Sequence, residues 1–379
     1  MRFLHTSDWH IGRSFHNVSL LQDQEHILQQ IIQIAKEQQV DALLVAGDIY
    51  DRSVPPATAV ALLNQIVDVI INELKIPIIL ISGNHDSAQR LGFAAKQLQR
   101  TGLHILGELS NITQSVVLED QFGEVAFWGL PYADPAQIRS AFDTDVSTHD
   151  QGISFMCEQV NNELHQGQRN VVLSHCFIDG ASESESERPL SIGGADRVSW
   201  QHFENFDYVA LGHLHGRQFK GKPCIRYSGS PLKYSFSEEK HIKSVVIVDM
   251  DAQGECEYQQ VVLEPLRDMR SIEGELADIL KNALSDLKSD DYLLVKLTDS
   301  HAILDVMGKL RAVYPNILHL ERPGLMAKKT ANSVMPNQLN ASELSMFSDF
   351  FTQVMDRPLS GEEQSLVQKT IDDVNREGN

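Results

Sequence analysis

Seven side chains that offer oxygen or nitrogen donors follow short apolar runs in the sequence. They are Asp8, His10, Asp48, Asn84, His175, His213 and His215. Seven such groups are too many for one four-coordinate zinc ion, but they suit two divalent ions that share a carboxylate. Mixed imidazole and carboxylate ligands favour manganese, iron or zinc over calcium. Two ions about 3.5–4 Å apart can hold a hydroxide and neutralise phosphoryl charge, so the pattern favours phosphoester hydrolysis.

The elements that must position these groups are short runs, each four to six residues long and mostly apolar, as strands buried on both faces are. The runs are Arg2–Thr6, Ala42–Ala46, Pro77–Ile81, Val125–Leu130, Val171–Ser174, Tyr208–Leu211, Ile225–Ser228 and Ser244–Asp249. Helical patterns lie between the early runs, and Asp134-Pro135 is typical of a helix start. This order predicts a layered α/β domain in which the polar groups meet at the carboxyl edge of a mixed sheet.

Each fragment alone has an ordinary structural interpretation. Asp8-x-His10 and Gly47-Asp48 are usually turns, and an isolated His175 after a strand is more often a core or edge histidine than a ligand. Gly83-Asn84-His85-Asp86 and Gly212-His213-x-His215 are more specific. Because all five fragments follow predicted strands, the probability that they occur together by chance is below about one in twenty.

In this order the fragments resemble the calcineurin-like metallophosphoesterases. More narrowly, the segments 6–13, 46–51, 211–215 and 227–236 resemble the SbcD family of bacterial nuclease subunits. The resemblance implies a four-layer α-β-β-α sandwich with a small α+β capping domain and C-terminal helices. It extends from residue 1 to about residue 265 with specific motifs, and more loosely into the capping domain.

The resemblance also implies a role for each matching position. One manganese ion would be held by Asp8, His10, Asp48 and His215. The other would be held by Asp48, Asn84, His175 and His213, so that Asp48 bridges the two.

His85 is not a ligand in that family. It would lie beside the scissile phosphate, aligned by Asp86, and assist departure of the leaving oxygen, because an imidazolium can donate a proton near neutral pH. The alternatives for His85 are an eighth ligand or a structural histidine. Some archaeal relatives carry a second non-ligand histidine where this sequence has Asp51, so that residue's contribution to DNA binding has no counterpart here.

Basic residues near the motifs are few, and Arg13 and Lys233 are the favoured substrate contacts. An acidic loop that holds Glu183, Glu185 and Glu187 would repel DNA unless it faces elsewhere. With 32 Lys and Arg against 52 Asp and Glu, the chain has a net charge of −20, so its overall field does not attract DNA or an anionic membrane.

The pattern changes near Pro265, so we divide the 379 residues into four parts. These are the nuclease domain 1–265, the capping domain 266–326, a linker 327–339 and C-terminal helices 340–379. Capping-box signals at Asn340-x-x-Glu343 and Ser360-x-x-Glu363 mark two helices in the last part. These helices either pack on their own body or dock a partner.

Four scattered cysteines without paired spacing favour a reduced cytoplasm, and neither a membrane span nor a signal peptide is expected. The sequence has no Gly-x-x-x-x-Gly-Lys motif, so any ATP dependence must come from a partner.

The first functional hypothesis is a dimetal DNA nuclease that docks an SbcC-type coiled-coil ATPase, with a homodimer of nuclease domains inside a heterotetramer. Such a complex degrades duplex ends 3′ to 5′ and nicks hairpins and single strands in replication, recombination and repair. The alternative is a stand-alone dimetal phosphatase or cyclic-nucleotide phosphodiesterase, which needs only residues 1–265. A non-catalytic scaffold ranks last, because all seven ligand positions and His85 are filled.

Overall fold

The computed structural model describes residues 1–187, 190, 196–301, 303–323, 344, 347–348, 351–352, 355 and 357–377. The chain divides into two compact units, Met1–Met269 and Arg270–Asn379. The expected linker 327–339 and most of the first expected C-terminal helix lie outside the described residues.

The larger unit contains two six-stranded sheets. The first has the strand order β16 (Cys256–Val262), β15 (Ser244–Met250), β1 (Arg2–Thr6), β4 (Ala42–Ala46), β5 (Ile78–Ile81) and β6 (Leu103–Ile105). The second has the order β13 (Gln218–Lys220), β14 (Lys222–Tyr227), β12 (Tyr208–Gly212), β9 (Arg169–His175), β8 (Gly123–Leu130) and β7 (Val116–Asp120). The central strands of each sheet run parallel, so their carboxyl ends lie at a common edge.

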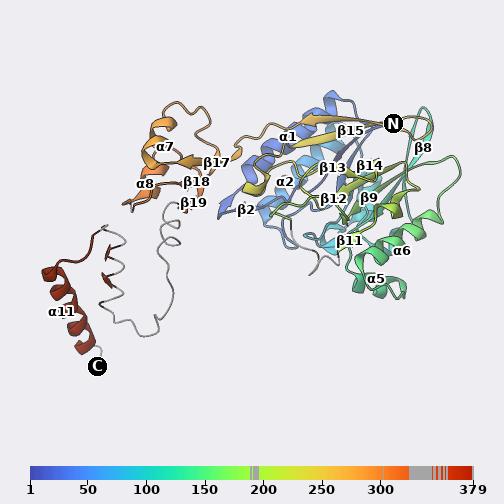
Figure 1. Cartoon of the computed structure of the whole chain (residues 1–379). Coiled ribbons are helices and arrows are strands. Elements are labelled where there is room, and N and C mark those ends of the chain that lie inside the picture. The colour runs from blue at the N-terminus through green and yellow to red at the C-terminus, as the bar shows by residue number, and fades with distance from the viewer. Residues whose placement is uncertain are drawn as a thin grey trace. The chain divides into compact units, whose positions relative to one another are not determined.

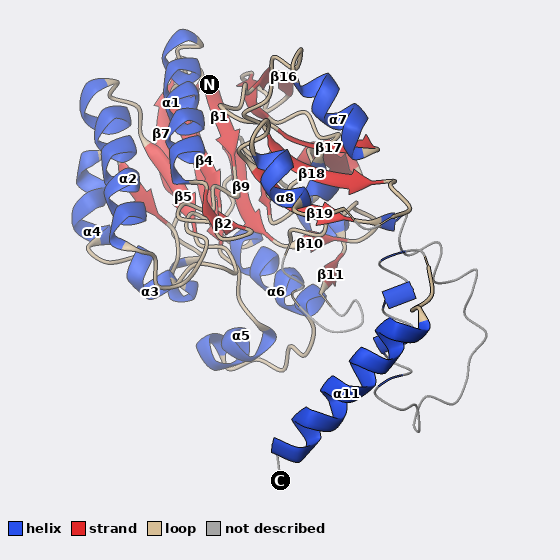
Figure 2. Ribbon diagram, turned by 90° about the vertical axis from the view of Figure 1, so that its left-hand side faces the viewer, coloured by secondary structure: helices blue, strands red, loops and turns tan. Residues whose placement is uncertain are grey.

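The two sheets pack face to face over a shared core. Phe3 and Leu44 of the first sheet and Phe127 and Val171 of the second belong to this core, which follows from the alternation of side chains along a strand. The opposite face of the second sheet packs against α5 (Pro135–Phe142) and α6 (His149–Asn161). Helices α1 (Leu21–Glu37) and α2 (Ala57–Asp68) lie on the outer side of the first sheet (Figures 1 and 2). The predicted four-layer α-β-β-α sandwich is confirmed.

All eight predicted strands form within a few residues of their expected bounds. The strands that the apolar runs do not predict are edge or near-edge strands, such as β16, whose side chains are only partly buried. Helix α5 begins as expected, with Asp134 and Gln137 forming a capping box before Pro135.

The smaller unit contains a three-stranded sheet of β17 (Met269–Gly274), β18 (Tyr292–Leu297) and β19 (Ile317–Glu321). Helices α7 (Leu276–Ala283) and α8 (Val306–Arg311) share an apolar core with it, as an α+β module requires. The Asp305 side chain caps the start of helix α8 by accepting from the Gly308 amide.

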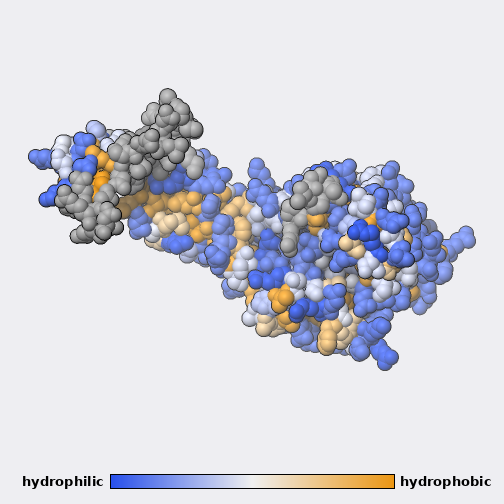
Figure 3. Space-filling view, turned by 90° about the horizontal axis from the view of Figure 1, so that it is seen from below, coloured by the Kyte–Doolittle hydropathy of each residue, from blue (hydrophilic) through white to orange (hydrophobic). Residues whose placement is uncertain are grey.

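The last helix, α11 (Gly361–Glu377), begins at the predicted capping box, in which the Ser360 amide donates to Glu363 Oε2 at 2.8 Å. In the described part of the chain, no helix combines the length and the apolar character that crossing a membrane requires. The face drawn in Figure 3 is largely hydrophilic over the larger unit.

Candidate metal centre

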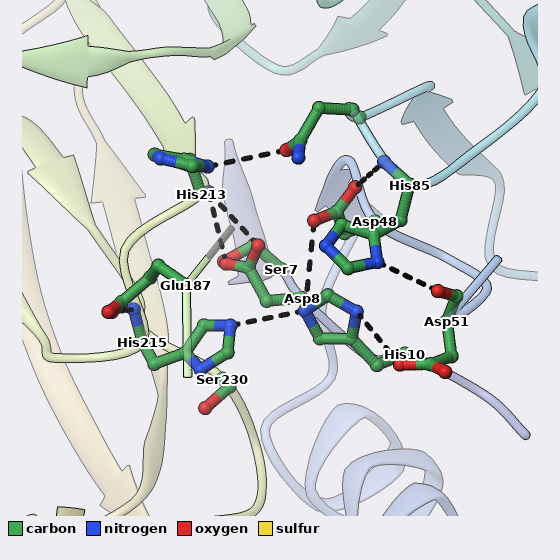
Figure 4. A network of polar contacts seen from close by, with 12 residues as sticks. Ser7, Asp8, His10, Asp48, Asp51, His85, Glu187, His213, His215 and Ser230 are labelled. Atoms are coloured by element: carbon green, nitrogen blue, oxygen red, sulfur yellow. Dashed lines mark hydrogen bonds and ion pairs between the residues drawn. The ribbon is translucent and has the colours of Figure 1, made fainter. Parts of the chain in front are cut away.

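The ends of five strands and the turns that follow them bring the seven predicted donor residues to one edge of the sandwich. Figure 4 labels five of them, Asp8, His10, Asp48, His213 and His215. Asp8 and His10 follow β1, Asp48 follows β4 and Asn84 follows β5. His175 ends β9, opposite Gly212 at the end of β12, and His213 and His215 come directly after. The donors therefore come from both sheets.

Three motif glycines allow the two sheets to approach at this edge. A Cβ atom at Gly212 would lie 1.8 Å from the Ala46 carbonyl oxygen. A Cβ atom at Gly47, which has a φ of +90°, would lie 2.4 Å from His175 Nδ1, and one at Gly83 would lie 2.2 Å from Asp48 Oδ1. These glycines are thus required by close packing around the donors.

Four of the donor residues have a left-handed backbone, which L residues other than glycine rarely adopt. They are Asp8, His10, Asp48 and His213, with φ of 54°, 46°, 50° and 102°. Backbone hydrogen bonds between turns hold this conformation, since Asp8 N donates to Gly47 O at 3.0 Å and His10 N to Asp48 O at 2.9 Å. Such strain is concentrated at functional sites.

One group of donors consists of Asp8, His10 and His215, whose ligand atoms lie within 4.8 Å of one another. The two histidine Nε2 atoms are 3.1 Å apart. His215 Nδ1 lies 2.8 Å from Ser186 Oγ and 3.3 Å from Glu238 Oε1. Because Ser186 Oγ donates its own proton to Glu238 and a carboxylate only accepts, His215 Nδ1 carries a proton and Nε2 presents a lone pair. His10 Nδ1 is buried and, among the described residues, has no hydrogen-bond partner.

A second group consists of Asp8, Asp48 and His175. His175 Nδ1 donates to the Ala46 carbonyl at 2.9 Å, so its Nε2 presents a lone pair. That Nε2 lies 2.9 Å from Asn84 Oδ1 and 3.6 Å from Asp48 Oδ2, and Asn84 Oδ1 lies 3.3 Å from His213 Nδ1. Acceptor atoms thus converge on one another, an arrangement that a bound cation would stabilise.

Burial sets the protonation of this site. It raises the pKa of Asp8 well above its ordinary value, and the negative charge of Asp48 adds to this effect. Burial also lowers the pKa of His10 and of His213 well below the usual value, with further contributions from neighbouring histidines. Burial thus favours the neutral form of the His10 and His213 imidazoles, which is the form that binds a metal, and a cation would reverse the effect on Asp8. The donor set fits two divalent ions.

His85 lies beside these groups and is partly exposed. Its amide donates to Asp48 Oδ1 at 2.9 Å, its Nδ1 donates to the Asp51 carbonyl at 2.7 Å, and its ring centroid lies 4.6 Å from that of His10. The residue that replaces the second histidine of some relatives thus orients His85 through its backbone.

Asp86 accepts hydrogen bonds from the backbone amides of Ile49 and Gly83 at 3.0 Å each and of Tyr50 at 2.9 Å. It therefore links the turns after β4 and β5, and the expected alignment of His85 acts through the backbone rather than through the His85 ring. Burial raises the pKa of Asp86 to about 7, and the charge of Asp48 contributes.

The structure separates the two basic residues that the sequence favoured. Arg13 lies near the donors, with Nη1 3.4 Å from Asp51 Oδ1 and its guanidinium over the Tyr234 ring at 5.0 Å. Lys233 instead donates to the Glu239 carbonyl at 2.7 Å and pairs with Asp268 at 2.7 Å. Its ammonium is thus occupied by groups outside the donor set.

Three supporting residues were not predicted. Glu187, from the loop expected to repel DNA, accepts from the His215 amide at 2.7 Å, so this acid faces inward. Glu238 is fully buried, and although burial raises its pKa, Lys243 and His215 outweigh that effect and hold it below the ordinary value. Lys243 in turn donates to Glu238 and, at 3.0 Å, to the His215 carbonyl. Glu187 belongs to the acidic loop of the sequence, and Glu238 and Lys243 follow the motif at 227–236, but neither position indicated a supporting role.

Comparisons with known proteins agree with this geometry. The family model of the calcineurin-like phosphoesterases matches residues 1–217, and that of the type 5 capsule protein repressor C-terminal domain matches residues 265–355. A curated relative, the SbcD subunit of nuclease SbcCD from Staphylococcus epidermidis, is 38% identical over 321 residues, which are 84% of this chain and 85% of the relative.

Solved structures with a similar fold include protein TT1561 of Thermus thermophilus, at 12% identity and a TM-score of 0.40 over 68% of this chain and 98% of that one. Another is a dimetal phosphatase from Danio rerio, at 11% identity and a TM-score of 0.37 over 70% of this chain and 99% of that one.

Proposed function

This chain belongs to the calcineurin-like phosphoesterase family, in the branch of the SbcD nuclease subunits, and on that premise we propose that it is the nuclease subunit of an ATP-dependent SbcCD-type complex. In this role it hydrolyses phosphodiester bonds of DNA. The proposal rests on one observation above all: seven donor residues from two sheets converge at one edge, with a partly exposed histidine beside them.

The donor set would hold two divalent ions, which supply a nucleophilic hydroxide and neutralise phosphoryl charge when bound. We assign Asp8, His10, Asp48 and His215 to one ion and Asp48, Asn84, His175 and His213 to the other. Manganese is the ion that we propose, because imidazole, amide and carboxylate ligands without sulfur suit it. The ordered turns and the hydrogen bonds to His175 Nδ1 and His215 Nδ1 orient these ligands in advance.

We assign to His85 the transfer of a proton to the leaving oxygen. Because Nδ1 donates to the Asp51 carbonyl, only Nε2 is available to exchange a proton with substrate. Asp86 keeps the turn that carries His85 in place. Arg13 would contact a phosphate of the strand from its position beside Asp51.

We propose that an SbcC-type coiled-coil ATPase docks on the C-terminal helices, which include α11. This partner would supply the ATP dependence that the sequence lacks and the positive charge that an acidic chain needs on DNA. The expected assembly is a heterotetramer with a homodimer of nuclease domains, acting in the cytoplasm, where the four free thiols remain reduced. A stand-alone phosphatase would leave the matched segment 265–355 without a use.

The proposal is tested by incubating the purified chain with labelled linear duplex and hairpin DNA in manganese, with and without the ATPase partner. We expect cleavage that EDTA abolishes and that His85→Gln reduces by about 10²–10⁴-fold, the usual contribution of a positioned proton donor. His104→Gln is the matched control, because His104 lies on β6 outside the donor set. Hydrolysis of a chromogenic phosphodiester without any DNA cleavage, even with the partner, would favour the small-substrate enzyme.

A further inference from the structure

A second polar hollow, with a volume of about 320 Å³, adjoins the metal centre. His215 contributes to its wall together with Ser228 and Ser230, while Arg217, Lys240 and Lys243 supply positive charge. The hollow and the metal centre therefore share one residue, and Ser228 Oγ lies 3.0 Å from Ser7 Oγ, which donates to Asp8.

Sheet topology places the hollow at the same edge as the metal centre. Strand β14 runs parallel to β12, so the segment after Tyr227 lies near the segment that carries His213 and His215. Strand β15 runs antiparallel to β1, so its start at Ser244 lies at the edge where β1 ends. The hollow and the donors therefore lie at the same edge of the sandwich.

Two of its cations are available to a ligand. Within the described part of the chain, the Arg217 guanidinium makes one long hydrogen bond, to Ser244 Oγ at 3.4 Å, and the exposed Lys240 ammonium makes none. Lys243 is instead neutralised by Glu238. Glu183 at the wall opposes one of the two free charges, which leaves a small positive excess on a chain whose net charge is −20.

We propose that this hollow is a subsite for a phosphate of the DNA strand near the phosphate that is cleaved. A guanidinium, an ammonium and serine hydroxyls are the groups that bind phosphate oxygens without reading sequence. The inference rests on the proposed function, since it extends the same substrate past His215. It also gives this acidic chain a local positive site for a polyanion.

The test measures binding of a labelled single-stranded oligonucleotide at several salt concentrations, in manganese and with His85→Gln to suppress cleavage. The double variant Arg217→Gln/Lys240→Gln is compared with Lys36→Gln/Arg100→Gln, which removes the same two charges from exposed positions outside the hollow. Each lost phosphate contact reduces the magnitude of the slope of log K against log salt by about 0.7. We therefore expect a reduction of about 1.4 for Arg217→Gln/Lys240→Gln and none for Lys36→Gln/Arg100→Gln. Lys240→Gln alone, at an exposed position, is expected to lower the slope by about 0.7.

Equal slopes in the two double variants would overturn the subsite, because the charges would then act only through the overall field. A different result would be that inorganic phosphate raises the unfolding temperature of the chain but not that of Arg217→Gln/Lys240→Gln, while the salt slope stays unchanged. That result would show a site for free anions and overturn the strand subsite. If the Arg217→Gln/Lys240→Gln variant shows the reduced slope but the chain with His85 intact does not cleave DNA, the subsite stands and the nuclease function is refuted. Cleavage with unchanged slopes would refute the subsite alone.

Discussion

Asp120 and Asp249 at one end of the sandwich are paired with arginine side chains, whereas in the described part of the chain the donor carboxylates at the other end have no such partner. At the end opposite the metal centre, Asp120 accepts from Arg169 Nη2 at 2.6 Å and Nη1 at 3.0 Å, and Arg2 pairs with Asp249 at 2.7 Å. The Arg169 hydrogen bonds outweigh burial and hold the pKa of Asp120 well below its ordinary value. These acids are stabilised by the chain itself.

At the metal centre, Asp8 and Asp48 are buried, and among the described residues no lysine or arginine pairs with either. Burial and mutual repulsion raise the pKa of Asp8 instead. The difference indicates that the carboxylates at one end are neutralised by side chains of the folded chain, whereas Asp8 and Asp48 at the other end are neutralised by cations from solution.

The largest expected effect is that of Asp48→Asn. Because Asp48 Oδ2 lies 3.7 Å from His10 Nε2 and 3.6 Å from His175 Nε2, its loss removes the carboxylate that we assign to both ions. We expect cleavage to slow by about a thousandfold or more, roughly 4 kcal/mol of barrier, in single-turnover assays. The metal-free chain should meanwhile unfold at a higher temperature, since repulsion with Asp8 is relieved. A lower temperature than wild type would make Asp48 a structural acid.

The control for that variant is Asp179→Asn. Asp179 pairs with Arg197 at 3.2 Å on the surface, where both side chains are largely exposed. An exposed pair of this kind contributes about 0–1 kcal/mol, so neither cleavage nor the unfolding temperature should change measurably.

The next effect belongs to the opposite end. Arg169→Met removes a buried guanidinium that also donates to the Gly123 carbonyl at 2.7 Å, and it leaves Asp120 without that partner. We expect the free energy of unfolding in urea to fall by about 3–5 kcal/mol. The double variant Arg169→Met/Asp120→Leu should lose less. If manganese restored the free energy of unfolding of Arg169→Met, the conclusion that this end is stabilised without metal would be contradicted.

Removal of metal should change how stability depends on pH. For the metal-free chain, the raised pKa of Asp86, about 7, means that the folded state binds its proton more tightly than the unfolded state does. The contribution of Asp86 to stability should therefore fall as pH rises from about 4 to about 7, the range between the ordinary and the folded pKa. The lowered pKa values of His10 and His213 act in the opposite sense, because their contribution rises with pH up to the ordinary histidine value. Asp120, with its lowered pKa, contributes in the opposite sense, because its stabilisation is lost on acidification.

Thermal unfolding in EDTA across this pH range tests the point. Asp48→Asn should flatten the fall, because the charge of Asp48 contributes to the raised pKa of Asp86. Manganese at about 100 times its Kd should add about 2.7 kcal/mol at neutral pH. The contribution of Asp86 is isolated as the difference in stability between the metal-free chain and its Asp86→Asn variant. A difference that does not fall from about pH 4 to about pH 7 would refute the raised pKa of Asp86.

The smallest effect concerns the residues behind His215. Glu238→Leu/Lys243→Met removes the carboxylate that accepts from Ser186 Oγ and faces His215 Nδ1, together with its buried counter-charge. We expect manganese affinity, measured by titration, to weaken by about 10–100-fold, as for other supporting carboxylates of histidine ligands. Glu238→Gln/Lys243→Met keeps an acceptor and should restore most of the affinity. Equal loss in both variants would show that only packing matters there.

Much of this arrangement could be predicted from the sequence, because the chemistry is local to strand ends. An apolar run followed at once by Gly-Asp or Gly-Asn-His-Asp specifies both a buried strand and a polar group at its carboxyl end. The expected strand Ala42–Ala46 and the capping box at Asp134 agree with the structure for the same reason: their determinants lie within a few residues.

Ion pairs and hydrogen bonds between residues far apart in the sequence could not be predicted from such local patterns. No local pattern indicated that Lys233 pairs with Asp268. None indicated that Glu187, in a loop expected to repel DNA unless it faces elsewhere, accepts from the His215 amide. Glu238 and Lys243 gave no signal at all, because an acid near a lysine in a polar stretch is most often a solvated surface pair.

By itself the sequence determined which residues would converge, since parallel strands bring their carboxyl ends to one edge of a sheet. Only the tertiary structure decided how they are held. The tautomers of His175 and His215 depend on the carbonyl of Ala46 and the carboxylate of Glu238, which reach them across two sheets and a loop. The physical reason is that strand order and burial follow from local periodicity, whereas proton positions and charge pairing follow from which groups share a desolvated space.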